Sequence, residues 1–123
     1  MIQGHVNAGL EPMLRLNLIA PDGGRTEVEA VLDTGFDGFL SLHSQVIASL
    51  QFPLIGVRDY ELGDGSLISF NVHEARIVWD GAAQLVPALD SDGDQLVGTA
   101  LLRDHSTYIE FRTGGIVRIE SLA

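Results

Sequence analysis

The chain contains no cysteine and no lysine among its 123 residues. Without cysteine, disulfide bonds, thiolate zinc sites and cysteine nucleophiles are excluded. Without lysine, a phosphate-binding P-loop and any mechanism through a lysine Schiff base are excluded as well. The chain must therefore fold on its apolar core, and its chemistry must come from other side chains.

Long apolar runs are also missing. No stretch of the sequence approaches the roughly 20 apolar residues that are needed to span a bilayer. No basic segment stands at the start of the chain, so we see no signal peptide. Because the lack of cysteine is compatible with a reducing compartment, we expect a cytoplasmic protein that makes no use of a membrane.

Positive charge is scarce. Seven arginines stand against ten aspartates and seven glutamates, which gives a formal net charge of −10. Such a chain repels phosphate backbones, so we expect no nucleic-acid partner. The length is that of one ordinary domain, and a hydrophobic content of 46% is sufficient for a core. We therefore expect a single domain over residues 1–123.

Short segments of alternating apolar and polar residues, separated by turn residues, run through the chain. Such alternation is typical of strands with one buried face, and Asp-Gly and Gly-Gly pairs are typical of the turns between them. Strands are expected at 14–18, 28–32, 39–42, 54–60, 66–72, 76–79, 82–89, 108–111 and 116–119. Brief helices are expected at 43–50, with Ser44 as N-cap, and at 99–104, with Leu101 and Leu102 buried. The pattern predicts an all-β barrel or sandwich with one or two short helices.

The most informative segment is the turn that follows the second expected strand. Val31 and Leu32 lead directly into Asp33, Thr34 and Gly35. A carboxylate at the edge of an apolar core is a candidate for acid–base chemistry. An aspartate two residues before glycine is also common in ordinary turns, so this triplet alone carries little information.

Two further features follow the triplet in order. A hairpin that turns at Asp64 and Gly65 comes about thirty residues later, and the apolar pair Leu96-Val97 then leads into Gly98. In this order and spacing the chain resembles the retropepsin-like, single-domain aspartic proteases, including the small bacterial and archaeal ones. The resemblance covers roughly residues 13 to 120. It implies a closed or partly open β-barrel of the single-lobe acid protease type.

The resemblance also implies an activity and a partner. Aspartic proteases hydrolyse peptide bonds with a water molecule activated by two carboxyl groups, and they need no cofactor or metal. A chain of this size supplies one such aspartate, so the family's active site is completed by a homodimer that binds a peptide or protein substrate. By this resemblance Asp33, Thr34 and Gly35 are catalytic, with the Thr34 hydroxyl bonding across the dimer axis and the Gly35 backbone left open to substrate.

The remaining roles are implied in the same way. Substrate would contact Phe36 and Asp37 after the triplet, and a flap formed by Gly63, Asp64 and Gly65 would close over it. Gly98 would pack beneath the catalytic loop. These positions are the expected site.

The chain departs from its viral relatives at two positions. Phe36 stands where they carry a small residue, and its ring could narrow the adjoining subsite. Thr99 stands where they carry an arginine that pairs with the aspartate at position 37, so Asp37 must have another partner or stay solvated. These departures keep a second hypothesis open, a weakly active or inactive peptide-binding or assembly module with the same fold.

Other candidate sites are weaker. Asp90, Asp92 and Asp94 alternate as in a calcium loop, but the sixth and twelfth positions of that motif are not filled, and only weak calcium binding stays open. No Gly-x-Ser-x-Gly segment supports a serine hydrolase. The four histidines show no spacing typical of metal ligands. They are His5, His43, His73 and His105.

Overall fold

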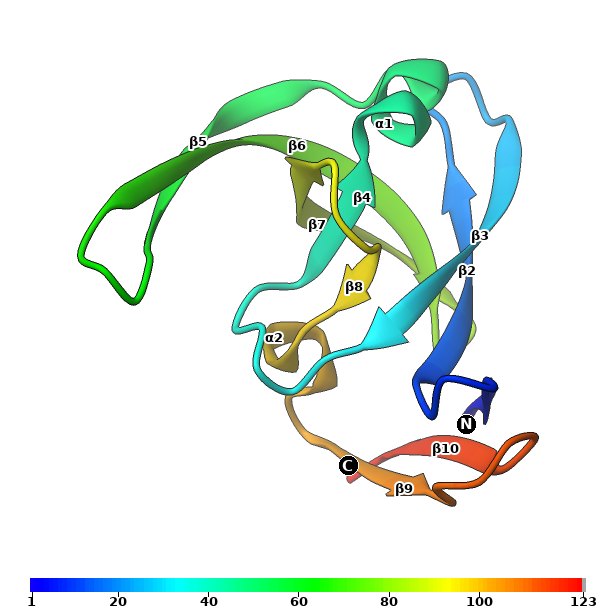
Figure 1. Cartoon of the computed structure of the whole chain (residues 1–123). Helices are drawn as coiled ribbons and strands as arrows, with labels where there is room; N and C mark the ends of the chain where they lie inside the picture. The colour runs from blue at the N-terminus through cyan, green and yellow to red at the C-terminus, as the bar shows by residue number, and fades with distance from the viewer. Residues whose placement is uncertain (123) are drawn as a thin grey trace.

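The structure is a computed structural model, and it describes residues 1–122 (Figure 1). Ten strands and two short helices follow one another along the chain. The strands are β1 (Ile2–Val6), β2 (Pro12–Ile19), β3 (Arg25–Leu32), β4 (Leu40–His43), β5 (Leu54–Glu61), β6 (Leu67–Trp79), β7 (Ala82–Ser91), β8 (Leu96–Val97), β9 (His105–Ile109) and β10 (Ile116–Ser121). The helices are α1 (Ser44–Leu50) and α2 (Thr99–Leu102). The expectation of an all-β chain with two brief helices is confirmed.

All ten strands belong to one mixed sheet. Its order is β5-β6-β7-β4-β8-β3-β2-β1-β10-β9, and β6 also pairs with β2. This additional pairing, between Asn17 and Val78 and between Leu18 and Ile77, joins six strands into a partial ring. The ring consists of β2, β3, β8, β4, β7 and β6. None of the helices in the described part of the chain is long and apolar enough to cross a membrane.

The core lies inside the ring, where the alternation of each strand points its apolar side chains. Leu14, Leu16 and Leu18 of β2 are buried, while Arg15 between them faces outward and lies within 4.0 Å of Glu27 on β3. This alternation is the physical reason that β2 could be predicted from the sequence, because one face is covered and the other is solvated.

Several details differ from the sequence prediction. The segments expected at 66–72 and 76–79 form one continuous strand, β6. β1 was not expected, and it pairs with both β2 and β10. α1 begins at Ser44 itself, since the preceding residue, His43, still has the extended backbone of β4 and occupies the cap position. α2 ends at Leu102, with Leu101 buried and Leu102 only half-buried. β9 begins at His105, earlier than the expected segment 108–111.

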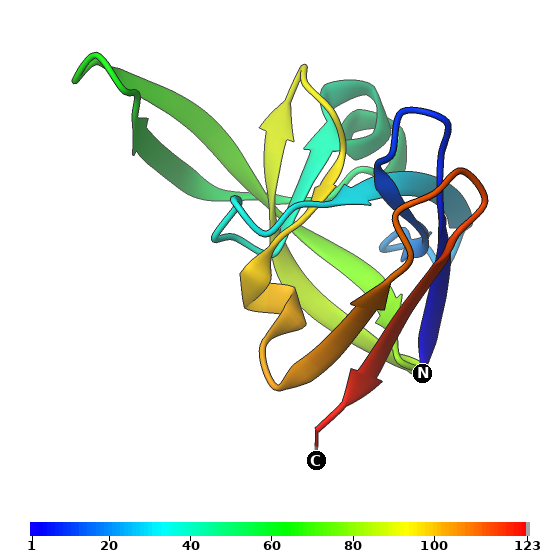
Figure 2. The same ribbon diagram turned by 60° about the horizontal axis from the view of Figure 1, so that its bottom comes forward.

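β5 and the first part of β6 form a long hairpin that extends away from the ring (Figures 1 and 2). We call residues 54–72 the arm. Its turn is closed by two backbone hydrogen bonds, from Leu62 N to Ser66 O (2.8 Å) and from Gly65 N to Leu62 O (2.9 Å). Gly65 has a φ of +85°, a conformation in which a Cβ atom is unfavourable. The Asp-Gly turn predicted from the sequence therefore forms at the tip of the arm.

Candidate active site

Two parallel strands bring the distant motifs of the sequence together. β3 and β8 pair with Val31 opposite Leu96 and Leu32 opposite Val97. Because parallel strands end at the same edge of a sheet, Asp33 and Gly98 become neighbours. The Asp33 N–H donates to the Val97 carbonyl over 2.9 Å. The site therefore begins where these two strands end.

The loop after Asp33 is held by the start of α2. Thr99 N donates to the Phe36 carbonyl (2.9 Å), and Ala100 N donates to the Gly38 carbonyl (3.2 Å). Gly98 lies directly beneath this loop, because a Cβ atom there would come within 2.1 Å of the Gly38 carbonyl oxygen. The loop and the start of α2 are thus in backbone contact, which only a residue without a side chain permits.

Asp33 itself is partly exposed at the head of the turn. Its Oδ1 accepts a hydrogen bond from Gly35 N over 2.8 Å, and its carbonyl accepts one from Phe36 N over 3.2 Å. Thr34 and Gly35 are exposed. The turn therefore offers a carboxylate and a threonine hydroxyl to a surface that another molecule can reach. Since the Gly35 N–H is used by Asp33, the group that Gly35 can offer a substrate is its carbonyl.

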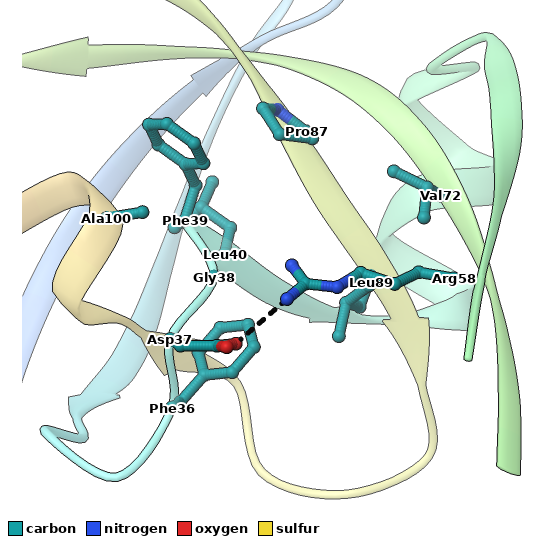
Figure 3. A pocket seen from close by; sticks show the side chains of 10 residues that line it. All are labelled: Phe36, Asp37, Gly38, Phe39, Leu40, Arg58, Val72, Pro87, Leu89 and Ala100. Atoms are coloured by element: carbon teal, nitrogen blue, oxygen red, sulfur yellow. Dashed lines mark hydrogen bonds and ion pairs between the residues drawn. The ribbon is translucent and has the colours of Figure 1, made fainter. Parts of the chain in front are cut away.

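Asp37 has a cationic partner from a different part of the chain. Arg58 Nη2 on β5 lies 3.1 Å from Asp37 Oδ1 (Figure 3). Both side chains are largely exposed, so this ion pair contributes little free energy of folding, at most about 1 kcal/mol. Its consequence is positional, because it joins the arm to the loop that carries Asp33. The sequence raised the question of a partner for Asp37 and did not identify Arg58.

Arg58 is in turn held by an aromatic ring. Its guanidinium carbon lies 4.7 Å above the centre of the Tyr60 ring, and Tyr60 meets Phe70 edge-on at 5.7 Å. Burial raises the pKa of the Tyr60 phenol, the Arg58 cation opposes this, and the nearby Asp37 carboxylate adds to it. Within residues 1–122, the buried Tyr60 oxygen reaches no partner at full hydrogen-bonding geometry.

The two faces of the arm differ in character. Residues directly opposite each other in antiparallel strands share a face, so the pairs Arg58–Phe70 and Tyr60–Ile68 lie on the same side. This side faces the Asp33 loop, since Arg58 reaches Asp37 from it. The opposite side carries polar residues such as Asp59, which accepts a hydrogen bond from the Ser69 hydroxyl. The arm therefore presents an aromatic and apolar underside to the site.

A cavity of about 110 Å³ lies where the arm meets the loop (Figure 3). It is lined mainly by apolar side chains, and the Asp37–Arg58 pair stands beside it. The lining residues are Phe36, Asp37, Gly38, Phe39, Leu40, Arg58, Val72, Pro87, Leu89 and Ala100. Phe36 is only 9% exposed, and its ring lies against Gly38 and Gly98. The ring thus forms part of the wall.

The structure does not bring every expected site residue together. Gly63, Asp64 and Gly65 form the tip of the arm, which stands away from the Asp33 turn in both views (Figures 1 and 2). The Asp64 carboxylate is occupied locally, because it accepts hydrogen bonds from the backbone and the hydroxyl of Ser66, and these bonds lower its pKa. Asp37 and Phe36, by contrast, lie beside the cavity.

The three aspartates Asp90, Asp92 and Asp94 do not come together as a set of metal ligands, and Asp90 belongs to β7. Asp90 accepts a hydrogen bond from the Ser44 hydroxyl, and its other oxygen lies 3.6 Å from His73 Nε2. Across residues 1–122, no group of three His, Asp or Glu side chains is arranged to hold a metal ion.

Comparison of the chain with models of known protein families gives no match, and comparison with curated protein sequences gives none either. The function of the site must therefore be inferred from its residues and their geometry.

Proposed function

We propose that the chain is one half of a homodimeric aspartic endopeptidase of the retropepsin-like kind. In this proposal two Asp33 carboxyl groups, one from each protomer, face each other across a two-fold axis and activate the water that attacks a peptide bond. The observation that carries the proposal is the environment of the Asp33 turn. Asp33 is partly exposed, and the backbone of the loop that follows it is fixed by the residues after β8.

The chemistry explains why two copies are needed. Hydrolysis of an amide requires one group to accept a proton from water and another to donate a proton to the leaving nitrogen. Two carboxyl groups in contact can do both, because like charges so close cannot both ionise and one proton is shared; aspartic proteases are the standard example of this effect. One chain supplies a single turn of this kind, and a two-fold axis brings each residue near its own copy.

The surrounding residues support specific roles. Thr34, exposed beside Asp33, is suited to bond across the axis and hold the two turns in register. The arm is suited to act as the flap, since its underside carries Tyr60, Ile68 and Phe70 and the Arg58–Asp37 pair anchors its base to the loop. Closure of the arm over an extended peptide would exclude water from the reaction.

The cavity beside Phe36 supports a preference in the substrate. Its volume of about 110 Å³ and its apolar wall suit an aliphatic side chain close to the cleaved bond. Its size argues against a large aromatic ring, since Phe36 already fills part of the space. We therefore expect cleavage next to valine or leucine rather than next to tryptophan.

The test is a cleavage assay on unfolded proteins and peptide libraries from acidic to neutral pH. Wild type is expected to cleave, and Asp33→Asn is expected to be inactive although it keeps the fold. The chain offers a matched control in Asp22→Asn, because the Asp22 carboxylate accepts a hydrogen bond from Gly24 N (2.9 Å) in a turn like that of Asp33 and Gly35. If Asp33→Asn and Asp22→Asn cleave equally well, the proposed catalytic role is refuted.

Thr34→Ala tests the role of the dimer. We expect it to weaken dimerisation and activity more than the unfolding free energy of the protomer, because Thr34 is exposed in the isolated chain. Sedimentation or gel filtration across a concentration series measures dimerisation, and denaturant titration measures the unfolding free energy of the protomer. Equal losses in all three quantities would contradict a bond across the axis.

A second candidate function is a peptide-binding or assembly module of the same fold with little turnover. The buried Phe36 ring in the cavity wall favours it, since this ring narrows the cavity between the arm and the loop. In that case wild type and Asp33→Asn would bind peptides with equal affinity and neither would cleave them. A dimer in which the two Asp33 carboxyl groups lie beyond hydrogen-bonding distance would lead to the same conclusion.

A further inference from the structure

Strand β6 has a free edge in the arm, on the side that faces away from β5. β7 pairs with β6 only from Val72 to Trp79, whereas β6 begins at Leu67. Beyond Val72 the two strands diverge, so that the arm and the end of β7 form the two sides of an open angle (Figure 2). Residues 67–70 pair with β5 alone among the strands of the sheet.

The register shows which backbone groups point to this edge. The two-residue turn at Asp80 and Gly81 makes Trp79 and Ala82 a hydrogen-bonded pair of β6 and β7. In antiparallel strands such pairs alternate with unbonded ones, and Glu74 opposite Pro87 is unbonded, as the missing N–H of proline requires. Odd-numbered residues of β6 therefore direct their N–H and C=O groups to the β7 side.

The opposite side of β6 gives the same result. Leu62 N donates to Ser66 O, so even-numbered residues of β6 bond to β5. Past the end of the pairing with β7, Leu67 and Ser69 therefore direct their N–H groups and carbonyls outward, and Asn71 adds its N–H; the Asn71 carbonyl faces Asp90 at the last β6–β7 bridge. Such a row is a template for an additional strand.

A groove of about 440 Å³ runs along this edge. It is lined by Ser44, Ile68, Ser69, Phe70, Asn71, Asp90, Ser91 and Asp92. Its charged members are both acidic, and no arginine lines it. Asp92 is exposed, while Asp90 is held in place by Ser44 and His73. The wall opposite the free strand edge is therefore negative.

We propose that the free edge of β6 is a second peptide-binding site, which takes an extended segment of another protein by strand addition and selects basic side chains through Asp90 and Asp92. The backbone groups supply affinity for an extended chain, and the acidic wall supplies the preference for arginine or lysine. The occupant is a basic segment of another protein, because the charged residues that line the groove are both acidic and this chain is itself strongly acidic.

The site is separate from the cavity beside Phe36, although Ile68 and Phe70 of the groove also belong to the underside of the arm. It uses the end of β7 and the edge of β6 to which the odd-numbered residues direct their backbone groups. The proposed catalytic cleft lies under the arm beside Phe36 and Asp37. Binding at this edge does not depend on hydrolysis. The experiment is therefore done with Asp33→Asn, so that failure of one proposal leaves the other standing.

The probe is a blocked hexapeptide of alternating arginine and valine, and the readout is amide exchange resolved by residue. On saturation with this peptide, the amides of Leu67, Ser69 and Asn71 are expected to gain protection. Those of Ile68 and Phe70 are expected to change little, since β5 already engages them. The proposal would be overturned if the protection did not alternate along β6, or if the amides of Leu67, Ser69 and Asn71 gained none.

A pair of variants at one position separates backbone from side chain. Ser69→Pro removes the outward N–H and is tolerated at a free strand edge, while Ser69→Ala keeps it and removes only the hydroxyl. Loss of this backbone bond is expected to weaken peptide binding about tenfold in Ser69→Pro relative to Ser69→Ala. Circular dichroism and the β5-side amide protection show that the arm still forms. Equal affinities of the two variants would refute strand addition.

Charge is tested separately. Asp92→Asn should weaken binding of the basic peptide and make it less sensitive to salt, and a peptide of alternating glutamate and valine should bind worst. If the acidic peptide binds as well as the basic one, the selectivity is refuted. Self-association that is abolished by Ser69→Pro would show that a second copy occupies the edge, and it would overturn the assignment to a foreign segment.

Discussion

Gly38 in the loop after Asp33 and Gly98 beneath this loop make a sharp prediction, because a methyl group added to each would meet different obstacles. At Gly98 the new Cβ would lie 2.1 Å from the Gly38 carbonyl oxygen and 2.7 Å from both the carbonyl oxygen and the ring atom Cδ2 of Phe36. At Gly38 the three nearest atoms all belong to the Phe36 ring, the closest at 2.5 Å. The obstacle at Gly98 is mainly backbone, and the obstacle at Gly38 is a side chain alone.

The magnitude for Gly98→Ala follows from what must move. Overpacking of a core costs about 1–3 kcal/mol when side chains can adjust. Here the two obstructing carbonyls accept hydrogen bonds from Ala100 N and Thr99 N, and their displacement breaks these bonds as well. At about 1 kcal/mol for each bond, the expected loss in unfolding free energy is about 3–5 kcal/mol. Gly38→Ala should cost less, about 1–3 kcal/mol, since a ring can swing.

Denaturant unfolding of a double-mutant cycle with Phe36→Leu measures the difference. The smaller side chain removes the obstacle at Gly38, so Gly38→Ala in the Phe36→Leu background should cost less than about 1 kcal/mol. Gly98→Ala should keep most of its cost in that background. Gly63→Ala is the control, because its Cβ would meet nothing within 4 Å, and it should change stability by less than about 0.5 kcal/mol.

The reasoning fails if Gly98→Ala unfolds at the wild-type denaturant concentration, or if Phe36→Leu rescues both glycine variants equally. Either result would mean that the loop and the start of α2 are not in the backbone contact on which the geometry of the Asp33 turn depends.

Three further predictions concern the arm. Arg58→Gln and Asp37→Asn should each change the unfolding free energy by less than about 1 kcal/mol, since the pair is exposed, but both should speed amide exchange in β5 because the tether to the loop is lost. Burial raises the pKa of Tyr60 above 10.0. In a Tyr108→Phe variant, the absorbance of the Tyr60 phenolate should therefore rise with a midpoint above pH 10.0. The contribution of this phenol to stability is present below pH 10.0 and is lost as the pH rises through its folded-state pKa. A midpoint at or below pH 10.0 would show that the ring is solvated. Gly65→Ala should cost about 1–2 kcal/mol of arm stability, since the residue has a φ of +85°, and unchanged exchange at the tip would contradict this.

Most strands that were predicted correctly share one property, a buried and a solvated face. β2 shows it in full, with Leu14, Leu16 and Leu18 inside and Arg15 and Asn17 outside. β1 also alternates, with Gln3 and His5 exposed, but it is short and its central inward residue, Gly4, has no apolar side chain to mark the pattern. β5 is an exception, because almost all of it is exposed, yet it was expected at 54–60 and is found at Leu54–Glu61.

The partner of Asp37 illustrates a different limit. Arg58 is the only basic residue of the arm, so a sequence argument could have proposed it. The contact nevertheless depends on how far the arm bends back over the loop, and this follows from the pairing of β6 with β7 and β2 rather than from residues near either partner. Local sequence patterns predict local structure, and this ion pair is a consequence of the closing of the ring.

The β2–β3 hairpin shows why the Asp33 triplet could not be interpreted by itself. The turn at Asp22 and Gly24 and the turn at Asp33 and Gly35 are almost the same locally, with carboxylate-to-amide distances of 2.9 and 2.8 Å. A Cβ added at Gly24 would lie 3.1 Å from Asp22 Oδ1, and one added at Gly35 would lie 3.2 Å from Asp33 Oδ1.

The two turns differ in the contacts that support them. The first is closed by hydrogen bonds among residues 20–24, whereas the second is held by Val97 and by the residues that follow Gly98, more than sixty positions away. A carboxylate in a surface turn can relax with its loop, but one whose loop is bonded to two other segments keeps its position when a partner approaches. Preorganisation of this kind is what acid–base catalysis requires. The distant support of Asp33, rather than the triplet, is therefore the physical argument for the catalytic role that we propose for it.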